Sequence, residues 1–441
     1  MPGTLRAAGL WVRLGGRQRP VFEDLQFELR PGEVVGVLGR SGSGKSVLVQ
    51  TLAGLLPWAR DGAVRGAVTL GGESLADLDP AQRAHHLATC LDRQEGQLFL
   101  PSVDSEWGTA LRQHRPQPGF AALVAAALGI DHLASRSIVE LSSGERQRVA
   151  LARTLVAAPR PVLLDEPSTH LDDSGLEGLR SALCAVREIG GSVLLTEHAG
   201  WLLAGAVDRW LELRDGQLVP APPPLEPAVA GPPPAPAPQT VLHLEQPQLQ
   251  RGGRRLLEGG ELRLLAGEIV HIGGPNGAGK SSLARALAGH AFSAGVRFDP
   301  GPAARWRPRE VALLLPSPDL QLFAPTAVEE VRLAGLGPLE AGEALARFGL
   351  VALAGRSPWT LSGGERQRLL LAAIEPGPAG VLILDEPAQG LDGDGLAELV
   401  RLLHRRAAEG GAVLVLSHRA ELARAAHRRM RLDAGRLEAG A

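Results

Sequence analysis

The sequence lacks several features that would assign its class at once. It has only two cysteines, Cys90 and Cys184, with no CxxC spacing, which argues against a disulfide framework or a thiolate zinc site and fits a reducing compartment. No apolar run approaches the ~20 residues that span a bilayer, and residues 1–16 lack the apolar core of a signal peptide. Acidic and basic residues nearly cancel, 48 against 46, so no global field attracts nucleic acid or lipid. We therefore expect a cytosolic chain that forms no membrane path alone.

Lysine is almost absent as well. Of the 46 basic residues only Lys45 and Lys280 are lysines, and both lie in the string GKS. The chain has no tyrosine and a single asparagine, Asn276, which indicates a compositional drift toward arginine wherever a generic positive charge suffices. A compact ammonium enters a tight loop of backbone amides, whereas a planar guanidinium does not. The two lysines therefore mark positions of special function.

The middle of the chain predicts a linker. Ten prolines fall in the 19 residues from Pro220 to Pro238, and such a segment favours extended polyproline II over a packed core. The 441 residues suffice for about three domains at ~150 residues each. We predict a first domain over 1–218, a linker over 219–240 and a second domain over 241–441.

The two halves repeat one another. LSSGERQR at Leu141 returns as LSGGERQR at Leu361, an offset of 220 residues (141 to 361). The string LDEP that contains Asp165 returns around Asp385 at the same offset (165 to 385). An internal repeat of this length indicates a tandem duplication.

Each half reads as α/β. Residues 34–39 are a short apolar run typical of a buried strand, and residues 46–56 have helical character. Two further apolar runs end near Asp165 and His198, at strand ends where doubly wound sheets bind ligands. The second half repeats the pattern.

Two strings, GRSGSGKS from Gly39 and GPNGAGKS from Gly274, match the phosphate-loop pattern G-x4-G-K-S between a strand and a helix. In such a loop, backbone amides surround the phosphates, the lysine reaches the β and γ phosphates, and the serine hydroxyl ligates Mg²⁺. The predicted phosphate-binding residues are Gly39, Ser41, Gly42, Gly44, Lys45, Ser46, Gly274, Asn276, Gly277, Gly279, Lys280 and Ser281.

Paired carboxylates complete the predicted chemistry. Asp165 and Asp385 end their strands where a metal-side carboxylate belongs. Glu166 and Glu386 follow directly and are placed to orient or deprotonate a water that attacks the γ-phosphate.

With these motifs the chain resembles the ATP-binding cassette family over nearly everything outside the linker. LSSGERQ and LSGGERQ are similar to the family signature, which caps the γ-phosphate of a nucleotide held by the opposite cassette. The resemblance implies an α/β fold of two tandem P-loop NTPase cassettes, each with a core sheet and a helical subdomain. It also implies that ATP and Mg²⁺ bind, and that the cassettes pair within the chain to form two composite sites.

The resemblance assigns further site residues. Ser142 and Gly144 are expected to face the nucleotide of the second half, and Ser362 and Gly364 that of the first. His198 and His418 occupy the family's histidine position beside the catalytic glutamates. Because both glutamates and both histidines are present, we expect two hydrolytically competent sites. Ser143 replaces a glycine of the first signature, which is a mild departure.

The QLF strings at Gln97 and Gln321 resemble the stretch after the Q-loop in energy-coupling-factor cassettes, which serve vitamin and metal importers. The Q-loop glutamine of that pattern falls on Asp92 and Pro316 here, so metal sensing at the second site is in doubt; Gln94 serves the first only if the loop shifts.

The family usually stacks adenine on an aromatic residue upstream of the phosphate loop. The first half offers only Trp11 near that place, with core or surface packing as the alternative role, and the second half offers none around Arg251.

The leading functional hypothesis is the ATPase subunit of an importer, peripheral on the cytoplasmic face of the membrane. Its partners would be separate membrane subunits, a transmembrane coupling protein and a substrate-binding protein, received by helical inserts at 107–137 and 331–359. A sugar or peptide importer ATPase is one alternative. A soluble twin-cassette translation factor that binds ribosomes is another, but the short, nearly uncharged linker argues against it and we expect no nucleic acid partner.

Overall fold

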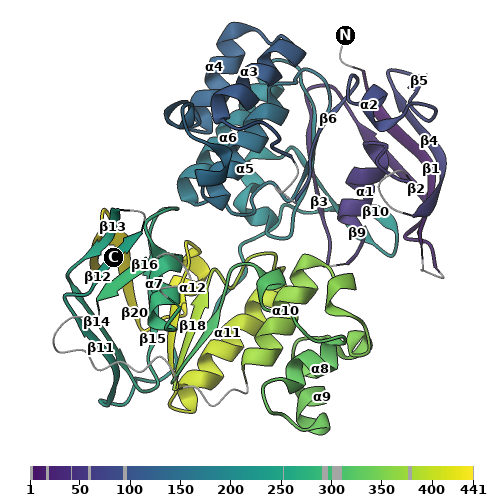
Figure 1. Ribbon diagram of the computed structural model, residues 1–441. Coiled ribbons are helices and arrows are strands. Elements are labelled where there is room, and N and C mark those ends of the chain that lie inside the picture. Colours follow the sequence, from purple (N-terminus) through teal and green to yellow (C-terminus); the bar gives the residue numbers. More distant parts are fainter. Residues whose placement is uncertain are drawn as a thin grey trace. The chain divides into compact units, whose positions relative to one another are not determined.

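The computed structural model consists of two compact units, Met1–Glu226 and Pro227–Ala441, and the boundary between them falls in the proline-rich segment (Figure 1). The structure describes residues 3–15, 19–40, 42–57, 61–92, 97–251, 253–290, 296–299, 310–375 and 380–440. Ser41 and Gln94 lie outside these residues.

The first unit alternates strands and helices. Its strands are β1 (Leu5–Leu14), β2 (Phe22–Leu29), β3 (Val34–Leu38), β4 (Gly62–Leu70), β5 (Glu73–Ser74), β6 (Ala88–Cys90), β7 (Val162–Asp165), β8 (Val193–Thr196), β9 (Arg209–Arg214) and β10 (Gln217–Ala221). Its α-helices are α1 (Lys45–Leu52), α2 (Pro80–Arg83), α3 (Val103–His114), α4 (Pro118–Ala127), α5 (Ser143–Leu155) and α6 (Asp173–Glu188).

A six-stranded sheet of order β10-β9-β3-β8-β7-β6 forms the centre of the first unit, and all neighbours except β9 and β10 are parallel. Its strands β3, β7 and β8 are mainly apolar because both faces of the sheet are covered there. Leu163 and Leu194 pack toward α1 and the antiparallel sheet β2-β1-β4-β5. Leu164 and Leu195 pack on the opposite face, in the core that includes residues of α4, α5 and α6.

Helices of the first unit begin at side-chain caps that the sequence encodes. Ser102, Ser142 and Asp172 each accept a hydrogen bond from a backbone N–H in the first turn of α3, α5 and α6. Within this unit, α3 and α4 lie on the side away from β1 and β4 (Figure 1). They form the helical subdomain that the sequence predicts between the Q-loop and the signature.

The second unit repeats the design. Its strands are β11 (Thr240–Glu245), β12 (Gln248–Arg251), β13 (Arg254–Glu258), β14 (Glu261–Leu265), β15 (Ile269–Gly273), β16 (Val296–Asp299), β17 (Val311–Leu314), β18 (Val381–Asp385), β19 (Ala412–Leu416), β20 (Arg428–Asp433) and β21 (Arg436–Ala439). Its α-helices are α7 (Lys280–Leu287), α8 (Ala327–Arg332), α9 (Pro338–Arg347), α10 (Gly363–Ile374), α11 (Gly393–Ala408) and α12 (Ala420–Arg424).

Its central sheet has the order β17-β18-β19-β15-β20-β21, strand for strand the arrangement of the first unit. The predicted fold, two tandem α/β cassettes, is therefore confirmed. Smaller sheets β11-β14 and β13-β12-β16 take the place of the four-stranded sheet. In the part of the chain that the structure describes, no helix is both long and apolar enough to cross a membrane.

Candidate active sites

The phosphate loop of the first unit connects β3 to α1, as the sequence predicts. Gly44 caps α1 with φ 110°, and a Cβ there would lie 2.6 Å from Val21 Cγ1, so only glycine fits this turn. Lys45 is 4% exposed, and its Nζ donates a hydrogen bond to Gly39 O (2.7 Å). The lysine is thus folded back across its own loop, with Ser46 in the same first turn of the helix.

The second unit builds the same loop between β15 and α7. Gly279 caps the helix with φ 108°, and Lys280 Nζ donates to Gly274 O (2.6 Å). Gly274 itself has φ 143°, and a Cβ there would clash with Leu432 O of β20. The helix N-terminus and the buried ammonium together give each loop the positive potential that suits a phosphate.

Around the first loop, the predicted side chains converge from three strand ends. Thr196 Oγ1 of β8 donates to Asp165 Oδ1 (2.6 Å), and Lys45 Nζ lies 3.2 Å from His198 Nδ1. His198 Nε2 in turn lies 2.7 Å from Glu166 Oε1. Predicted loop, metal-side and water-side residues are thus brought into one connected cluster.

The second loop has an equivalent cluster with different contacts. His418 Nδ1 lies 3.1 Å from Glu386 Oε2, and Lys280 Nζ lies 3.9 Å from Glu386 Oε1. Ser417 Oγ donates to Glu386 Oε2 (2.8 Å). The buried Asp385 ends β18 beside these residues.

The carboxylates of the two clusters divide into groups with raised and lowered pKa. Burial raises the pKa of Asp165 to about 6 and that of Asp385 to about 7, although hydrogen bonds from Ser46 and Ser281 oppose the shift. Burial also disfavours charge on Glu386, but His418 and Lys280 outweigh it and lower its pKa to about 2. Against the same burial, His198 lowers the pKa of Glu166.

These donor sets fit a magnesium ion. A hydroxyl and a carboxylate from Ser46 and Asp165, or from Ser281 and Asp385, are the hard oxygen ligands that Mg²⁺ takes beside substrate phosphates. Both aspartates are nearly inaccessible and lack a neighbouring charge strong enough to keep their pKa in the usual range. A divalent cation beside them would restore the charged form.

The signature residues start helices in both units. Ser142 Oγ accepts from Glu145 N (3.2 Å) at the start of α5, and Ser362 Oγ accepts from Glu365 N (3.4 Å) at the start of α10. Each glutamate side chain also accepts from the serine N–H, which closes a capping box. Gly144 and Gly364 occupy the second helical position.

The side chains of the QLF glutamines hydrogen-bond to backbone groups six to eight residues upstream. Gln97 Oε1 accepts from Leu91 N (2.9 Å), and Gln321 Oε1 accepts from Leu315 N (2.7 Å). The side-chain amide of Gln97 also donates to Leu91 O, directly after β6, and that of Gln321 donates to Leu313 O of β17 (2.9 Å). Pro316, which stands where the family pattern has its Q-loop glutamine, directly follows Leu315.

Trp11, the candidate adenine platform, lies on the outward face of β1 opposite Arg65 of β4. The guanidinium carbons of Arg65 and Arg13 lie 5.0 and 5.9 Å from its ring centre. Its ring therefore already packs against two arginines.

Several residues near the sites are not among the site residues that the sequence predicts. Glu106 and Glu330 are buried behind the QLF loops, Glu197 and Ser417 precede the two histidines, and His271 lies in the middle of β15. Burial lowers the pKa of His271 to about 4. Position was the available sequence signal for four of them: Glu106 and Glu330 each lie nine residues after a QLF glutamine (97 to 106 and 321 to 330), and Glu197 and Ser417 directly precede the histidines.

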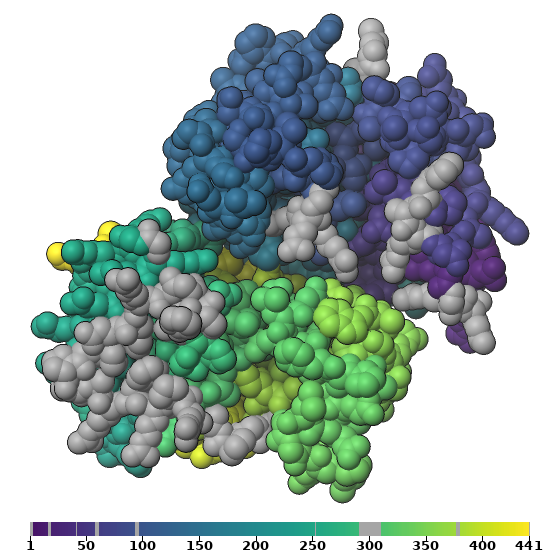
Figure 2. Space-filling model, in the orientation of Figure 1, coloured from purple at the N-terminus to yellow at the C-terminus, as the bar shows by residue number. Residues whose placement is uncertain are grey.

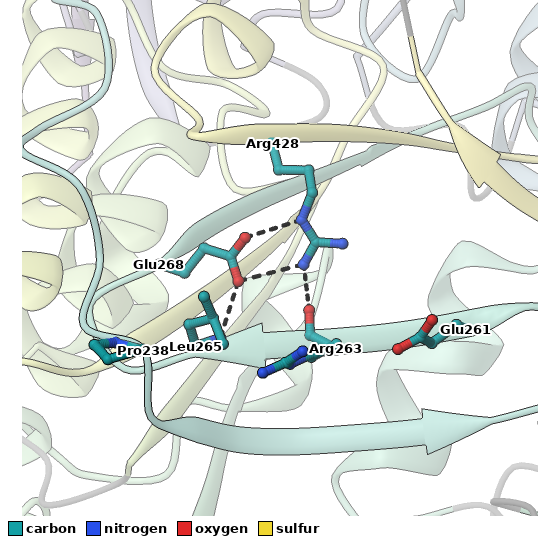
Figure 3. A pocket seen from close by; sticks show the side chains of 6 residues that line it. All are labelled: Pro238, Glu261, Arg263, Leu265, Glu268 and Arg428. Carbon is teal, nitrogen blue, oxygen red and sulfur yellow. Dashed lines mark hydrogen bonds and ion pairs between the residues drawn. The ribbon is translucent and has the colours of Figure 1, made fainter.

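A surface pocket of the second unit lies apart from this machinery. It is lined by Pro238, Glu261, Arg263, Leu265, Glu268 and Arg428 (Figure 3). Arg428 spans it, with Nε 2.9 Å from Glu268 Oε1 and a further bond to the carbonyl of Arg263. None of its lining residues belongs to the phosphate loop.

A duplicated α/β fold, with a phosphate loop and a carboxylate–histidine cluster in each half, defines a P-loop ATPase with two cassettes. The family model for the ABC transporter matches residues 22–169 and 257–389. The chain belongs to this family, and it is an ABC ATPase with two cassettes.

Curated relatives match over most of their length. A Treponema denticola protein named as an ABC transporter ATP-binding protein is 29% identical over 90% of this chain and 88% of its own. A Bacillus subtilis protein named as an HMP/thiamine import ATP-binding protein is 29% identical over 92% and 85%. A ribose import ATP-binding protein of Rubrobacter xylanophilus is 30% identical over 95% and 88%.

Solved structures with two cassettes share the fold. The structure titled RNase-L Inhibitor covers 97% of this chain and 89% of its own at 22% identity with a TM-score of 0.66. An archaeal ribosome recycling factor, in complex with a ribosomal stalk protein, covers 98% and 90% at 22% identity with a TM-score of 0.68. At this identity the likeness shows the fold alone.

Proposed function

We propose that this chain is the ATPase subunit of a membrane importer of the energy-coupling-factor type, which takes up a vitamin or a metal ion. It would act as a peripheral protein on the cytoplasmic face of the membrane. The observation that carries the proposal is a pair of exposed aromatic residues, Phe99 and Phe323, that follow the Q-loops at equivalent positions with side chains 72% and 76% exposed.

Both aromatics stand on a rigid base. The backbone N–H groups of Phe99 and Leu100 donate to the buried Glu106 at the start of α3. In the second cassette, Phe323 N and Ala324 N donate to Glu330 Oε2 (2.8 and 2.7 Å). A loop that buries a carboxylate to hold an exposed phenylalanine is built to present that ring to a partner.

Further exposed apolar side chains lie in or close to the helical subdomains. They are Leu123 and Val139 in the first cassette and Leu320, Leu333, Leu339, Val351 and Trp359 in the second. The segment α8–α9, which carries part of this set, lies on the visible surface of the molecule, in green (Figure 2). Apolar surface of this kind supports a role in receiving hydrophobic membrane subunits.

The proposed chemistry uses the two clusters directly. Loop amides with Lys45 and Lys280 would hold the phosphates of ATP, and Ser46 with Asp165 and Ser281 with Asp385 would hold Mg²⁺, which neutralises phosphate charge. Glu166 and Glu386, ionised at neutral pH, would accept a proton from the attacking water. His198 and His418 would orient that water and the glutamates. Completion of each site by the signature of the other cassette stays a prediction from the family resemblance.

A sugar importer ATPase is the second candidate, and the ribose import relative at 30% identity favours it. The two candidates differ in their partners. An energy-coupling-factor type is expected to bring down one or two small, very hydrophobic proteins, whereas the sugar type is expected to bring down a permease pair.

The test is affinity capture of the tagged chain from gently solubilised membranes of its native host, followed by mass spectrometry. We expect hydrophobic membrane subunits with the wild-type chain and their loss with Phe99→Ala/Phe323→Ala. Leu225→Ala is the matched control, because Leu225 is also exposed but lies in the linker. Recovery with ribosomal proteins from the soluble fraction would instead support the translation-factor reading and contradict the proposal.

A further inference from the structure

The residue before each active-site histidine differs between the cassettes. In the first cassette it is Glu197, which is 2% exposed. Its Oε1 accepts from Ser168 N (2.9 Å) and its Oε2 accepts from Ser168 Oγ (2.8 Å). Since Ser168 lies two residues after Glu166, this carboxylate ties the loop that follows the glutamate to the end of β8.

In the second cassette the equivalent residue is Ser417, which is fully buried. The partner position of Ser168 is occupied by Ala388, so the loop offers no side-chain hydroxyl there. Ser417 Oγ instead donates to Glu386 Oε2 (2.8 Å) and accepts from Arg419 N (3.2 Å). The hydroxyl thus binds the glutamate side chain itself.

Both glutamates need an anchor because their backbones are strained. Glu166 has φ 51° and Glu386 has φ 48°, a left-handed conformation that residues other than glycine hold only when their surroundings impose it. Each glutamate N–H is fixed by the neighbouring strand, to Thr196 O (3.0 Å) and to Leu416 O (2.8 Å). The side-chain anchors add the second constraint, one on the loop and one on the carboxylate.

The burial of Glu197 is energetically unfavourable, which argues that its carboxylate does more than fill space in the core. Burial raises the pKa of Glu197 to about 7, although the hydrogen bonds from Ser168 favour its charged form. The charged groups that face it are Glu166, which also raises the pKa, and His198, which lowers it. A buried carboxylate next to a second carboxylate persists only where something is gained elsewhere.

We propose that Glu197 and Ser417 are positioning residues that aim the two hydrolytic glutamates by different routes. Glu197 acts on Glu166 through Ser168 and the loop backbone. Ser417 acts on Glu386 through a direct hydrogen bond. The two ATP sites of the chain are therefore held by anchors that are not interchangeable.

For the second site, the experiment compares Ser417→Ala with Ser417→Thr in the chain that carries Glu166→Gln. Ser417→Ala is expected to lower kcat for ATP about tenfold, the effect of losing one hydrogen bond to a charged group, with KM and nucleotide affinity unchanged. Ser417→Thr keeps the hydroxyl and is expected to restore most of kcat. If Glu166→Gln alone abolishes turnover, the two sites hydrolyse ATP only together. The same comparison is then made in the otherwise wild-type chain, where the fall in kcat measures the full effect of the change at Ser417.

For the first site, a double-mutant cycle of Glu197→Gln and Ser168→Ala is measured in the chain that carries Glu386→Gln, or in the wild-type chain if that variant is inactive. Each single change is expected to lower kcat severalfold, and the double variant is expected to be no worse than the more damaging single one, because the residues act through one contact.

The matched control is Ser192→Ala at the other end of β8. Ser192 is 1% exposed, and its hydroxyl has no hydrogen-bond partner among the residues that the structure describes, so its removal is expected to leave kcat and KM unchanged. Three outcomes would each overturn the proposal. The first is that the effects of Glu197→Gln and Ser168→Ala on kcat are additive. The others are that Ser417→Thr binds nucleotide but is as slow as Ser417→Ala, or that a rise in KM accounts for the loss of activity.

Discussion

Replacing both glutamates, by Glu166→Gln with Glu386→Gln, removes the two proton acceptors with little change in shape. The amide keeps the size of the carboxylate and one oxygen that accepts from Ser417, so the local fold should hold. A positioned general base contributes about 10² to 10⁴ in rate. We therefore expect kcat for ATP to fall by at least about 100-fold in the double variant.

Nucleotide binding should survive the same change. The loop contacts Lys45 to Gly39 and Lys280 to Gly274 involve neither glutamate. In the second cassette Glu386 Oε1 lies 3.9 Å from Lys280 Nζ, and removing this negative charge lessens repulsion of the phosphates. ATP affinity is therefore expected to be equal to that of the wild type or tighter.

The assay combines steady-state phosphate release with equilibrium binding of a fluorescent ATP analogue. Glu73→Gln, an exposed glutamate of β5, serves as the control and should hydrolyse ATP normally. Independent sites predict that each single variant keeps about half of the activity, and coupled sites predict a larger loss. Hydrolysis at the wild-type rate in the double variant would refute the role assigned to both glutamates.

Three further outcomes are expected. Ser46→Ala and Ser281→Ala should raise the Mg²⁺ concentration needed for half-maximal hydrolysis, and an unchanged magnesium titration would argue against these ligands. Glu106→Ala and Glu330→Ala each leave two backbone amides without an acceptor, so urea unfolding should show a loss of about 1–3 kcal/mol, whereas Glu106→Gln, which keeps the accepting oxygen, should lose less. The pKa of Glu197 is raised from 4.5 to about 7, so the folded state binds this proton more tightly than the unfolded state does. The stabilisation is fully present below pH 4.5 and is lost as the pH rises through 7. The melting temperature should therefore vary less between pH 5 and 8 in Glu197→Gln than in the wild type, and an equal dependence on pH would contradict this assignment.

The sequence alone determined the parts of this protein that depend on local order. A phosphate loop needs glycines, a lysine and a serine at fixed spacing between a strand and a helix. The sequence alone therefore predicted both loops, at Gly39–Ser46 and Gly274–Ser281. The duplication could be predicted because the motifs recur in the same order, with the signature and the LDEP string both repeated after 220 residues (141 to 361 and 165 to 385). The central parallel strands could be predicted because strands that are covered on both faces are apolar at most positions.

Tertiary structure alone decided the contacts between segments far apart in the chain. Three sets of contacts depend on where side chains meet in the folded chain. Gln97 bonds to Leu91, and Glu106 holds the QLF loop. Glu197 and Ser417 anchor different parts of the two glutamate loops. A glutamate or a serine before a histidine carries no local pattern that names its partner. Only the folded chain, which brings the end of β8 beside Ser168 and the end of β19 beside Glu386, fixes that choice.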